Sequence, residues 1–240
     1  MADIRIVDAI QVGLWFLAAL MSLYFSIGTA RIWTSISTGF FLIFLSEGYL
    51  LAPWVDDPRL KGIHLIVGTI AIMVMTYGFL EYYFFSRTLE ASGKKSNVYL
   101  MTAGVIAASM IFLLINPAPS ATVLRHIHLV ANVNWVFLSL INLYMIRMIY
   151  IQIRDTRAAP GFIAFGVVFA CIFLWRGSEL YLQVYCWDAA WNDHLLELGA
   201  SVTIDFPRRI WFSGLVNQIS SILSSVSVGA TFLYLYRLLR

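Results

Sequence analysis

The sequence predicts an all-α fold, a polytopic bundle of about seven transmembrane helices. Of its 240 residues, 60% are hydrophobic and only 12% are charged, and the mean hydropathy is +0.81. Apolar stretches of about 20 residues, enough to cross a hydrocarbon core of about 30 Å, recur along the whole chain. The alternating pattern of membrane β-strands is absent, so helices are expected to satisfy the backbone hydrogen bonds in lipid.

Seven apolar stretches are long enough to cross a bilayer, and short connections join them. The predicted spans are 8–29, 33–54, 60–85, 98–116, 123–150, 162–186 and 210–237. Proline marks several of the breaks, as at Pro53, Pro117 and Pro160. No polar segment is long enough for a separate soluble domain, so residues 1–240 are expected to form a single transmembrane domain.

The distribution of basic residues predicts the orientation, because loops rich in lysine and arginine stay in the cytoplasm. The basic residues that decide it are Arg87, Lys94, Lys95, Arg147, Arg154, Arg157, Arg237 and Arg240. The N-terminus is therefore predicted outside and the C-terminus inside, in a bacterial inner (plasma) membrane. The longest connection, residues 187–209, lies outside, and Trp187 and Trp191 predict that it follows the membrane interface.

Ionisable groups within the spans fall at one depth. With the predicted orientation, the outer halves of four spans contain Glu47, His64, His126, His128, Arg176 and Glu179. Such groups cost about 3 kcal/mol each in hydrocarbon unless they are paired, and they usually face a bundle interior or a water-filled cavity. We therefore expect a polar pocket in the outer leaflet.

Helical spacing predicts which side chains face this pocket. A stripe with three- or four-residue spacing runs along the span 123–150 and comprises His128, Asn132, Trp135, Ser139 and Asn142. His126 lies about 200° from His128 around the helix axis, so only one of the two can point inward unless the first turn is unwound. His128 is expected to be that one. Arg176 and Glu179, three residues apart, are expected to neutralise each other.

Two imidazoles in one pocket suggest a cofactor. His64 and His128 lie near the starts of two non-adjacent spans that enter from the same side, and neutral imidazole binds haem iron and transition metals. At the level of architecture only, this arrangement resembles membrane b-type cytochromes; the resemblance covers two residues and implies at most one haem b. Arg176, Asn132 and Trp135 would line the cofactor pocket.

These residues suggest an integral subunit of a redox or respiratory assembly, with its haem b or transition metal close to a quinone site. Glu47 and Glu179 would act as acid and base for quinol protons. For a metal ion, the candidate ligands are His64, His128 and His126. Partner subunits of a membrane complex would supply the other electron carriers.

Other interpretations stay open. The histidines can lie at the level of the lipid headgroups, satisfied by water, or Glu47 and Glu179 can form a proton relay. The protein can be a cofactor-free receptor, transporter or scaffold subunit with a small-ligand pocket. It can also be an intramembrane enzyme acting on an isoprenoid or lipid, with Glu47 or Glu179 as a general acid.

Composition and motifs narrow the range of partners. Sixteen basic and thirteen acidic residues, scattered along the chain, give a formal charge of +3 and no nucleic-acid surface. Membrane lipid and protein subunits are the expected partners. Ser221, Ser225 and Gly229 are four residues apart in the span 210–237, and small residues at this spacing allow close helix packing, including between two copies of the chain.

Overall fold

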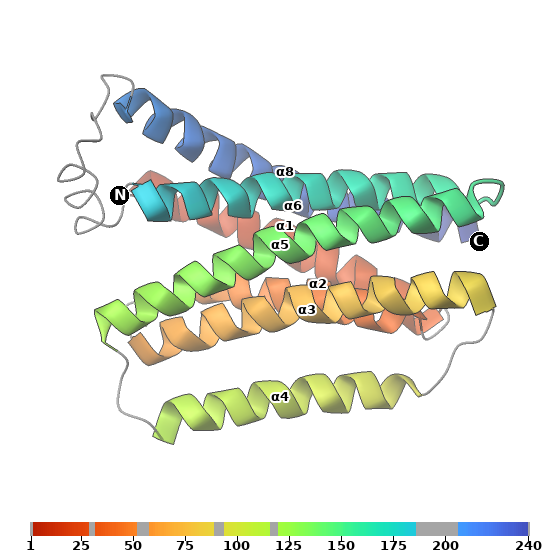
Figure 1. Ribbon diagram of the computed structural model, residues 1–240, viewed down its shortest axis with the longest axis horizontal. Coiled ribbons are helices and arrows are strands. Elements are labelled where there is room, and N and C mark those ends of the chain that lie inside the picture. The colour runs from red at the N-terminus through yellow and green to blue at the C-terminus, as the bar shows by residue number, and fades with distance from the viewer. Residues whose placement is uncertain are drawn as a thin grey trace.

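The computed structural model describes residues 2–28, 32–51, 58–88, 94–115, 120–185 and 206–239. These residues form helices only: α1 (Ala2–Gly28), α2 (Ile32–Gly48), a short 3-10 helix η1 (Tyr49–Leu51), α3 (Pro58–Thr88), α4 (Lys95–Ile115), α5 (Ala121–Ile153), α6 (Ala159–Tyr185) and α8 (Phe206–Leu239). Successive α-helices run in alternating directions, and the two ends of the chain lie at opposite ends of the bundle (Figure 1). An odd number of membrane crossings requires this placement of the ends.

Six of these helices are long and apolar enough to cross a membrane. The exception is α2, which has 17 residues and is continued by η1. The protein is therefore a multi-pass helical membrane protein, and the predicted all-α fold is confirmed, with seven α-helices among the described residues. Which end of the bundle faces the cytoplasm stays a prediction.

Several helices begin at or next to a proline, which is tolerated in the first turn because its missing N–H would have no partner there. Pro58 begins α3, Pro160 is the second residue of α6, and Pro207 is the second residue of α8. The last case corrects the predicted connection 187–209, because its final four residues belong to α8. The rest of that connection lies outside the described residues up to Asp205.

The centre of the bundle is α2, whose residues 33–40 are all buried. Its polar side chains have partners within the bundle: Ser37 Oγ donates to Ser22 O at 2.8 Å, Thr38 Oγ1 to Thr34 O at 2.7 Å, and Ser35 Oγ to Glu81 Oε2 at 3.1 Å. These hydroxyls are therefore satisfied inside the protein, as buried polar groups usually are.

Two glycines allow α2 and α3 to pack closely. A Cβ at Gly39 would lie 2.9 Å from Ala71 O, and one at Gly78 would lie 2.7 Å from Ile36 Cγ1 and 2.9 Å from Ile36 N. Both positions face backbone atoms that cannot rotate away. Any larger residue at either position would have to separate the two helices.

One half of the bundle is packed with aromatic rings. Its fully buried rings include Phe40, Phe79, Phe162, Phe165, Phe169 and Phe232. Phe165 lies at the centre, with ring centroids 5.5 Å from Phe79, 5.5 Å from Phe232 and 6.4 Å from Phe40. We call these six residues the aromatic core.

The helix α4 lies at the edge of the bundle, beside α3 (Figure 1). Only 11% of the apolar stretch of α4 that is long enough to cross a membrane is buried within the protein. Lys95 Nζ fastens its first turn by donating to Ser26 O at 2.9 Å. In a membrane, the remaining surface of α4 contacts lipid.

Candidate functional site

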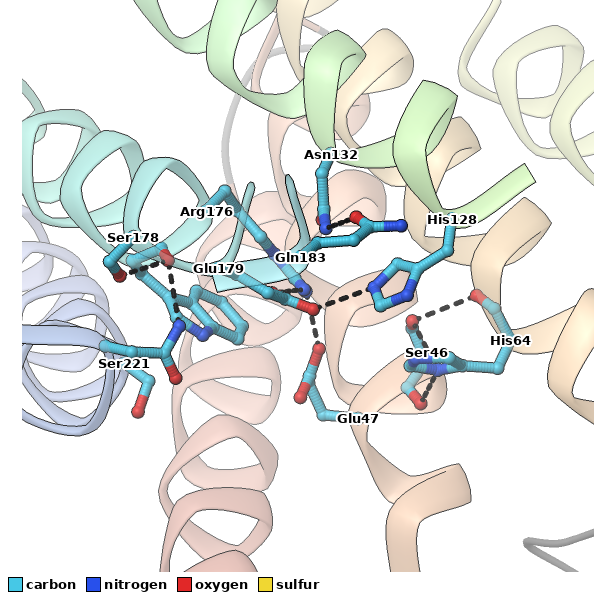
Figure 2. A network of polar contacts seen from close by, with 12 residues as sticks. Ser46, Glu47, His64, His128, Asn132, Arg176, Ser178, Glu179, Gln183 and Ser221 are labelled. Carbon is cyan, nitrogen blue, oxygen red and sulfur yellow. Dashed lines mark hydrogen bonds and ion pairs between the residues drawn. The ribbon is translucent and has the colours of Figure 1, made fainter. Parts of the chain in front are cut away.

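The ends of α2 and α6 and the starts of α3 and α5 meet at one end of the bundle (Figure 1). At this end, polar side chains from these helices point toward one another (Figure 2). Ser120 begins α5 as its N-cap, with its Oγ accepting from Val123 N at 3.3 Å. This cap starts the helix about two turns before the histidines.

Four ionisable side chains form a continuous chain of contacts, which we call the charge chain. Arg176 lies at its centre, with Nη2 donating to Glu47 Oε1 at 2.7 Å and Nη1 to Glu179 Oε2 at 2.8 Å. His128 Nε2 lies 2.9 Å from Glu179 Oε1. The predicted pairing of Arg176 with Glu179 is confirmed, and Glu47 is added from α2.

Exposure increases along the charge chain in one direction. The exposed fraction of the side chain is 3% for Glu47, 9% for Arg176, 16% for Glu179 and 20% for His128. The chain therefore leads from the surface at His128 to the interior at Glu47.

Two tryptophans enclose the Arg176 guanidinium. Its Cζ lies 3.9 Å from the centroid of the Trp175 ring and 5.0 Å from that of the Trp135 ring. Stacking of this kind stabilises a desolvated cation. Trp135, which was predicted to line a cofactor pocket, is 2% exposed and lies against Arg176; its role toward a cofactor stays a prediction.

Neutral polar groups extend the site on both sides. Gln11 Nε2 donates to Glu47 Oε2 at 3.4 Å, and Ser221 Oγ donates to Gln11 Oε1 at 3.2 Å. Asn132 Nδ2 donates to Gln183 Oε1 at 3.0 Å. Hydrogen bonds of this kind hold the charged groups in place, because each buried carboxylate needs donors beyond its one arginine.

Among the histidines, His128 points inward and His126 does not. His128 is partly buried and contacts Glu179, whereas His126 is exposed. This confirms the choice made from helical spacing. Within the described ranges, no group of three or more His, Cys, Asp or Glu side chains is arranged to hold a metal ion, so His64, His126 and His128 do not form a three-histidine cluster.

His64 lies beside the charge chain, at the start of α3 (Figure 2). Its Nδ1 is 2.6 Å from Ser46 O, and its ring stacks on Tyr49 with a centroid distance of 5.3 Å. A carbonyl oxygen only accepts, so Nδ1 carries the hydrogen and the neutral ring keeps its lone pair on Nε2. Arg176, Glu179 and His128 all lie within electrostatic range of this ring.

Some functional residues gave no recognisable signal in the sequence. Gln11 is a single polar residue in an apolar span, Ser221 was noted only for helix packing, and Ser46 precedes Glu47 without any motif. Depth within a span is the one signal that Gln11 shares with Glu47. Their contact depends on how α1 packs against α2, which spacing along one helix does not predict.

The small-residue face of α8 packs within the chain. Ser221 contacts Gln11, and a Cβ at Gly229 would lie 3.8 Å from Met21 Sδ, so this face lies against α1. Ser221 and Ser225 are both buried there. Association of two copies through other parts of the predicted span 210–237 stays a prediction.

Comparison with known proteins found no matching family model and no similar curated protein.

Proposed function

We propose that this integral membrane protein binds and releases a proton inside the bilayer, as the proton-handling step of a transport or redox reaction. The observation that carries the proposal is the charge chain, which joins His128 at the protein surface to Glu47 in the interior. Ionisable groups at such depth are typical of proton relays and of ion or substrate pathways.

Stability alone does not explain the charge chain. Removing three charged side chains from water costs several kcal/mol per ion, and well-packed apolar residues are often as stable or more stable. The aromatic core of the same protein shows that its helices can be packed with apolar rings. The buried Glu–Arg–Glu triplet is therefore better explained by a function than by a gain in stability.

The four groups differ in what each can do with a proton. Arg176 stays protonated and fixes a positive charge between the two carboxylates. With both glutamates ionised and His128 neutral the charge chain has a net charge of −1, and protonation of His128 brings it to zero. His128 is the most exposed of the four side chains, so it is the entry point.

The proton then moves from His128 to Glu179. His128 takes a proton from water and becomes imidazolium, with Nε2–H directed at Glu179 Oε1 at 2.9 Å. Transfer along this hydrogen bond leaves a neutral imidazole and a neutral carboxylic acid. Arg176 then keeps Glu47 as its ionised partner, and the proton is held inside the membrane until Glu179 gives it up.

Infrared difference spectroscopy tests the proposal on the full chain in lipid nanodiscs. Between mildly alkaline and mildly acidic buffer, the wild type is expected to show an imidazole change together with a change in a carboxyl band. Glu179→Gln should remove the carboxyl change, and His128→Ala should remove the carboxyl change and reduce the imidazole change. His126→Ala is the matched control and should keep the carboxyl change.

A full carboxyl change in His128→Ala would contradict the proposal, because the proton would then reach Glu179 by another route. A carboxyl change that survives in Glu179→Gln would also contradict it.

A second function, that of a redox subunit with a haem b or a metal ion, is supported by the geometry of His64. With Nδ1 hydrogen-bonded to Ser46 O, the ring has the tautomer that haem and metal ligands use, with Nε2 as the donor atom. His128 would have to exchange its Glu179 contact for the iron. Arg176 and the two glutamates would then serve the propionates and the protons of a quinol.

Optical spectroscopy separates the two functions. The chain purified after expression with haem supplied is expected to absorb in the Soret region if the second function is correct, and His64→Ala should abolish that band. A preparation with neither a Soret band nor bound metal would remove the redox function and leave the proton-binding site.

A further inference from the structure

Two polar side chains on α5 are fully buried and have no hydrogen-bond partner in the part of the chain that the structure describes. Ser139 and Asn142 are both 0% exposed, and the unpartnered atoms are Ser139 Oγ and both Asn142 Nδ2 and Oδ1. Asn132, on the same stripe, bonds to Gln183. Leaving a buried polar group unsatisfied costs about 1–3 kcal/mol, so these two side chains call for a ligand.

Ser139 and Asn142 continue the line of polar groups that starts at His128. Trp135, Ser139 and Asn142 follow one another at spacings of four and three residues, so they share one face of α5. The stretch from His128 to Asn142 is about 21 Å of helix, or roughly two thirds of a hydrocarbon core. Polar groups on one face of α5 therefore extend past the middle of the membrane.

The line ends inside the protein. Ile146 and Ile149, the next residues on the same face, are 4% and 0% exposed and apolar. On this face of α5 the polar side chains therefore end at Asn142, and the next buried residues toward the opposite end of the helix are apolar.

Two further unpartnered donors border the charge chain. They are Trp15 Nε1 and Arg176 Nε, and both side chains contact the Trp175 ring, whose centroid is 6.1 Å from the centroid of the Trp15 ring and 3.9 Å from Arg176 Cζ. Unsatisfied hydrogen-bonding capacity thus occurs both at the charge chain and further along α5.

The chemistry of the unpartnered atoms selects the ligand. Asn142 presents two N–H donors and an acceptor oxygen, and the Ser139 hydroxyl can donate and accept. A metal cation would satisfy the oxygens and leave the Asn142 amide hydrogens facing a positive charge. Water both donates and accepts, and buried water typically makes about three hydrogen bonds to such groups.

We propose that Ser139 and Asn142 bind internal water molecules that prolong the proton path from the charge chain past Trp135. The proton-conducting role rests on the proposed function; the water site itself does not. Water that hydrogen-bonds to these side chains can accept a proton and pass it on while neither side chain changes its charge.

Nuclear magnetic resonance on the full chain, with ¹⁵N-labelled asparagine in nanodiscs, tests for the water directly. Cross-peaks between water and the Asn142 side-chain amide are expected in the wild type and should be absent in Asn142→Leu, which provides the assignment. Asn134→Leu, a half-buried asparagine on the same helix, is the matched control and should keep them. A wild-type Asn142 amide without water cross-peaks would overturn the proposal.

The unfolding temperature provides a second test, because a dry Asn142 and a water-bound Asn142 predict shifts of opposite sign in Asn142→Leu. A dry, unsatisfied Asn142 would make Asn142→Leu unfold at a higher temperature than the wild type. Bound water makes the same change lower the unfolding temperature, since hydrogen-bonded water is lost. If Asn142→Leu does not fold, Ser139→Ala gives the same comparison with a smaller change in volume, and a higher unfolding temperature there would overturn the proposal.

The proton path is tested by kinetics. After an acid jump, the rate at which the carboxyl band returns to its starting value is measured in the wild type and in Ser139→Ala. This rate is expected to be about tenfold lower in Ser139→Ala, because loss of one bound water slows proton return. Water cross-peaks that persist in Glu179→Gln, while the wild type shows no carboxyl change, would establish the water site and reject the proposed function. An unchanged rate in Ser139→Ala would reject the proton path.

Discussion

At one end of the bundle α2 and α6 contribute Glu47, Arg176 and Glu179, and within a few turns the same two helices contribute Phe40 and Phe165 to the aromatic core. Both regions are buried and both join helices distant in sequence. They differ in how they respond to the loss of one member. Apolar rings lose area and leave a cavity, whereas the charge chain leaves opposite charges without a partner.

The largest effect is expected from removing the central charge. Arg176→Met leaves Glu47 and Glu179 as uncompensated carboxylates and should lower the free energy of unfolding by about 3–5 kcal/mol. Reversible unfolding in mixed detergent micelles measures it. The matched control, Glu47→Gln with Arg176→Met and Glu179→Gln, removes all three charges and should return to within about 1–2 kcal/mol of the wild type. A triple variant as unstable as the single one would contradict the comparison.

A cavity in the aromatic core should cost nearly as much. Phe165→Ala removes a fully buried ring that lies against five other aromatic rings and should lower the free energy of unfolding by about 3–4 kcal/mol. The same unfolding assay applies, and Phe165→Leu, which keeps most of the volume, should cost clearly less. In contrast to the charge chain, no second substitution by a neutral isostere restores the loss.

The close contact of α2 and α3 should show a smaller effect. Gly78→Ala places a Cβ 2.9 Å from the backbone nitrogen of Ile36 and should cost about 1–3 kcal/mol. Gly104→Ala, on α4 with open space around it, is the control, and it should be neutral or slightly stabilising. Equal effects at the two glycines would show that backbone flexibility, and not the contact, sets the cost.

The smallest effect is expected at the exposed end of the charge chain, at His128. His128→Ala removes a partly buried hydrogen bond to a carboxylate and should cost about 1–2 kcal/mol, whereas His126→Ala should stay within about 0.5 kcal/mol. Unfolding measurements on the pair of variants check this. A larger loss for His126→Ala would mean that the first turn of α5 is held differently from the structure.

Patterns within one helix were predictable from the sequence, and contacts between helices were not. The helical spans follow from the length of the apolar stretches, and the polar stripe on α5 and the pair of Arg176 with Glu179 follow from spacing of three or four residues. Glu47 reaches Arg176 across 129 positions, and Gln11 reaches Glu47 across 36. Those contacts depend on which helices are neighbours and how each is rotated, which hydropathy leaves open.

The prediction was also limited where polar groups satisfy one another. The equal depth of Glu47, Glu179 and His128 indicated a shared pocket. Equal depth does not fix the rotation of each helix about its own axis, so the individual contacts could not be predicted. The aromatic core was not predicted, because Phe79 and Phe165 look in sequence like any lipid-facing residue. In a membrane both lipid and core are apolar, so hydrophobicity does not separate buried faces from exposed ones.

The burial of α2 has a consequence for how the chain enters the membrane. In the finished protein its serines and threonines meet other helices, but a helix of 17 residues that leaves the ribosome before α3 exists has only α1 beside it. Retention near the translocation channel until α3 is synthesised would shield those hydroxyls from lipid. The first three helices then form the unit of insertion, and cutting the reading frame between α2 and α3 would yield a nascent chain prone to degradation.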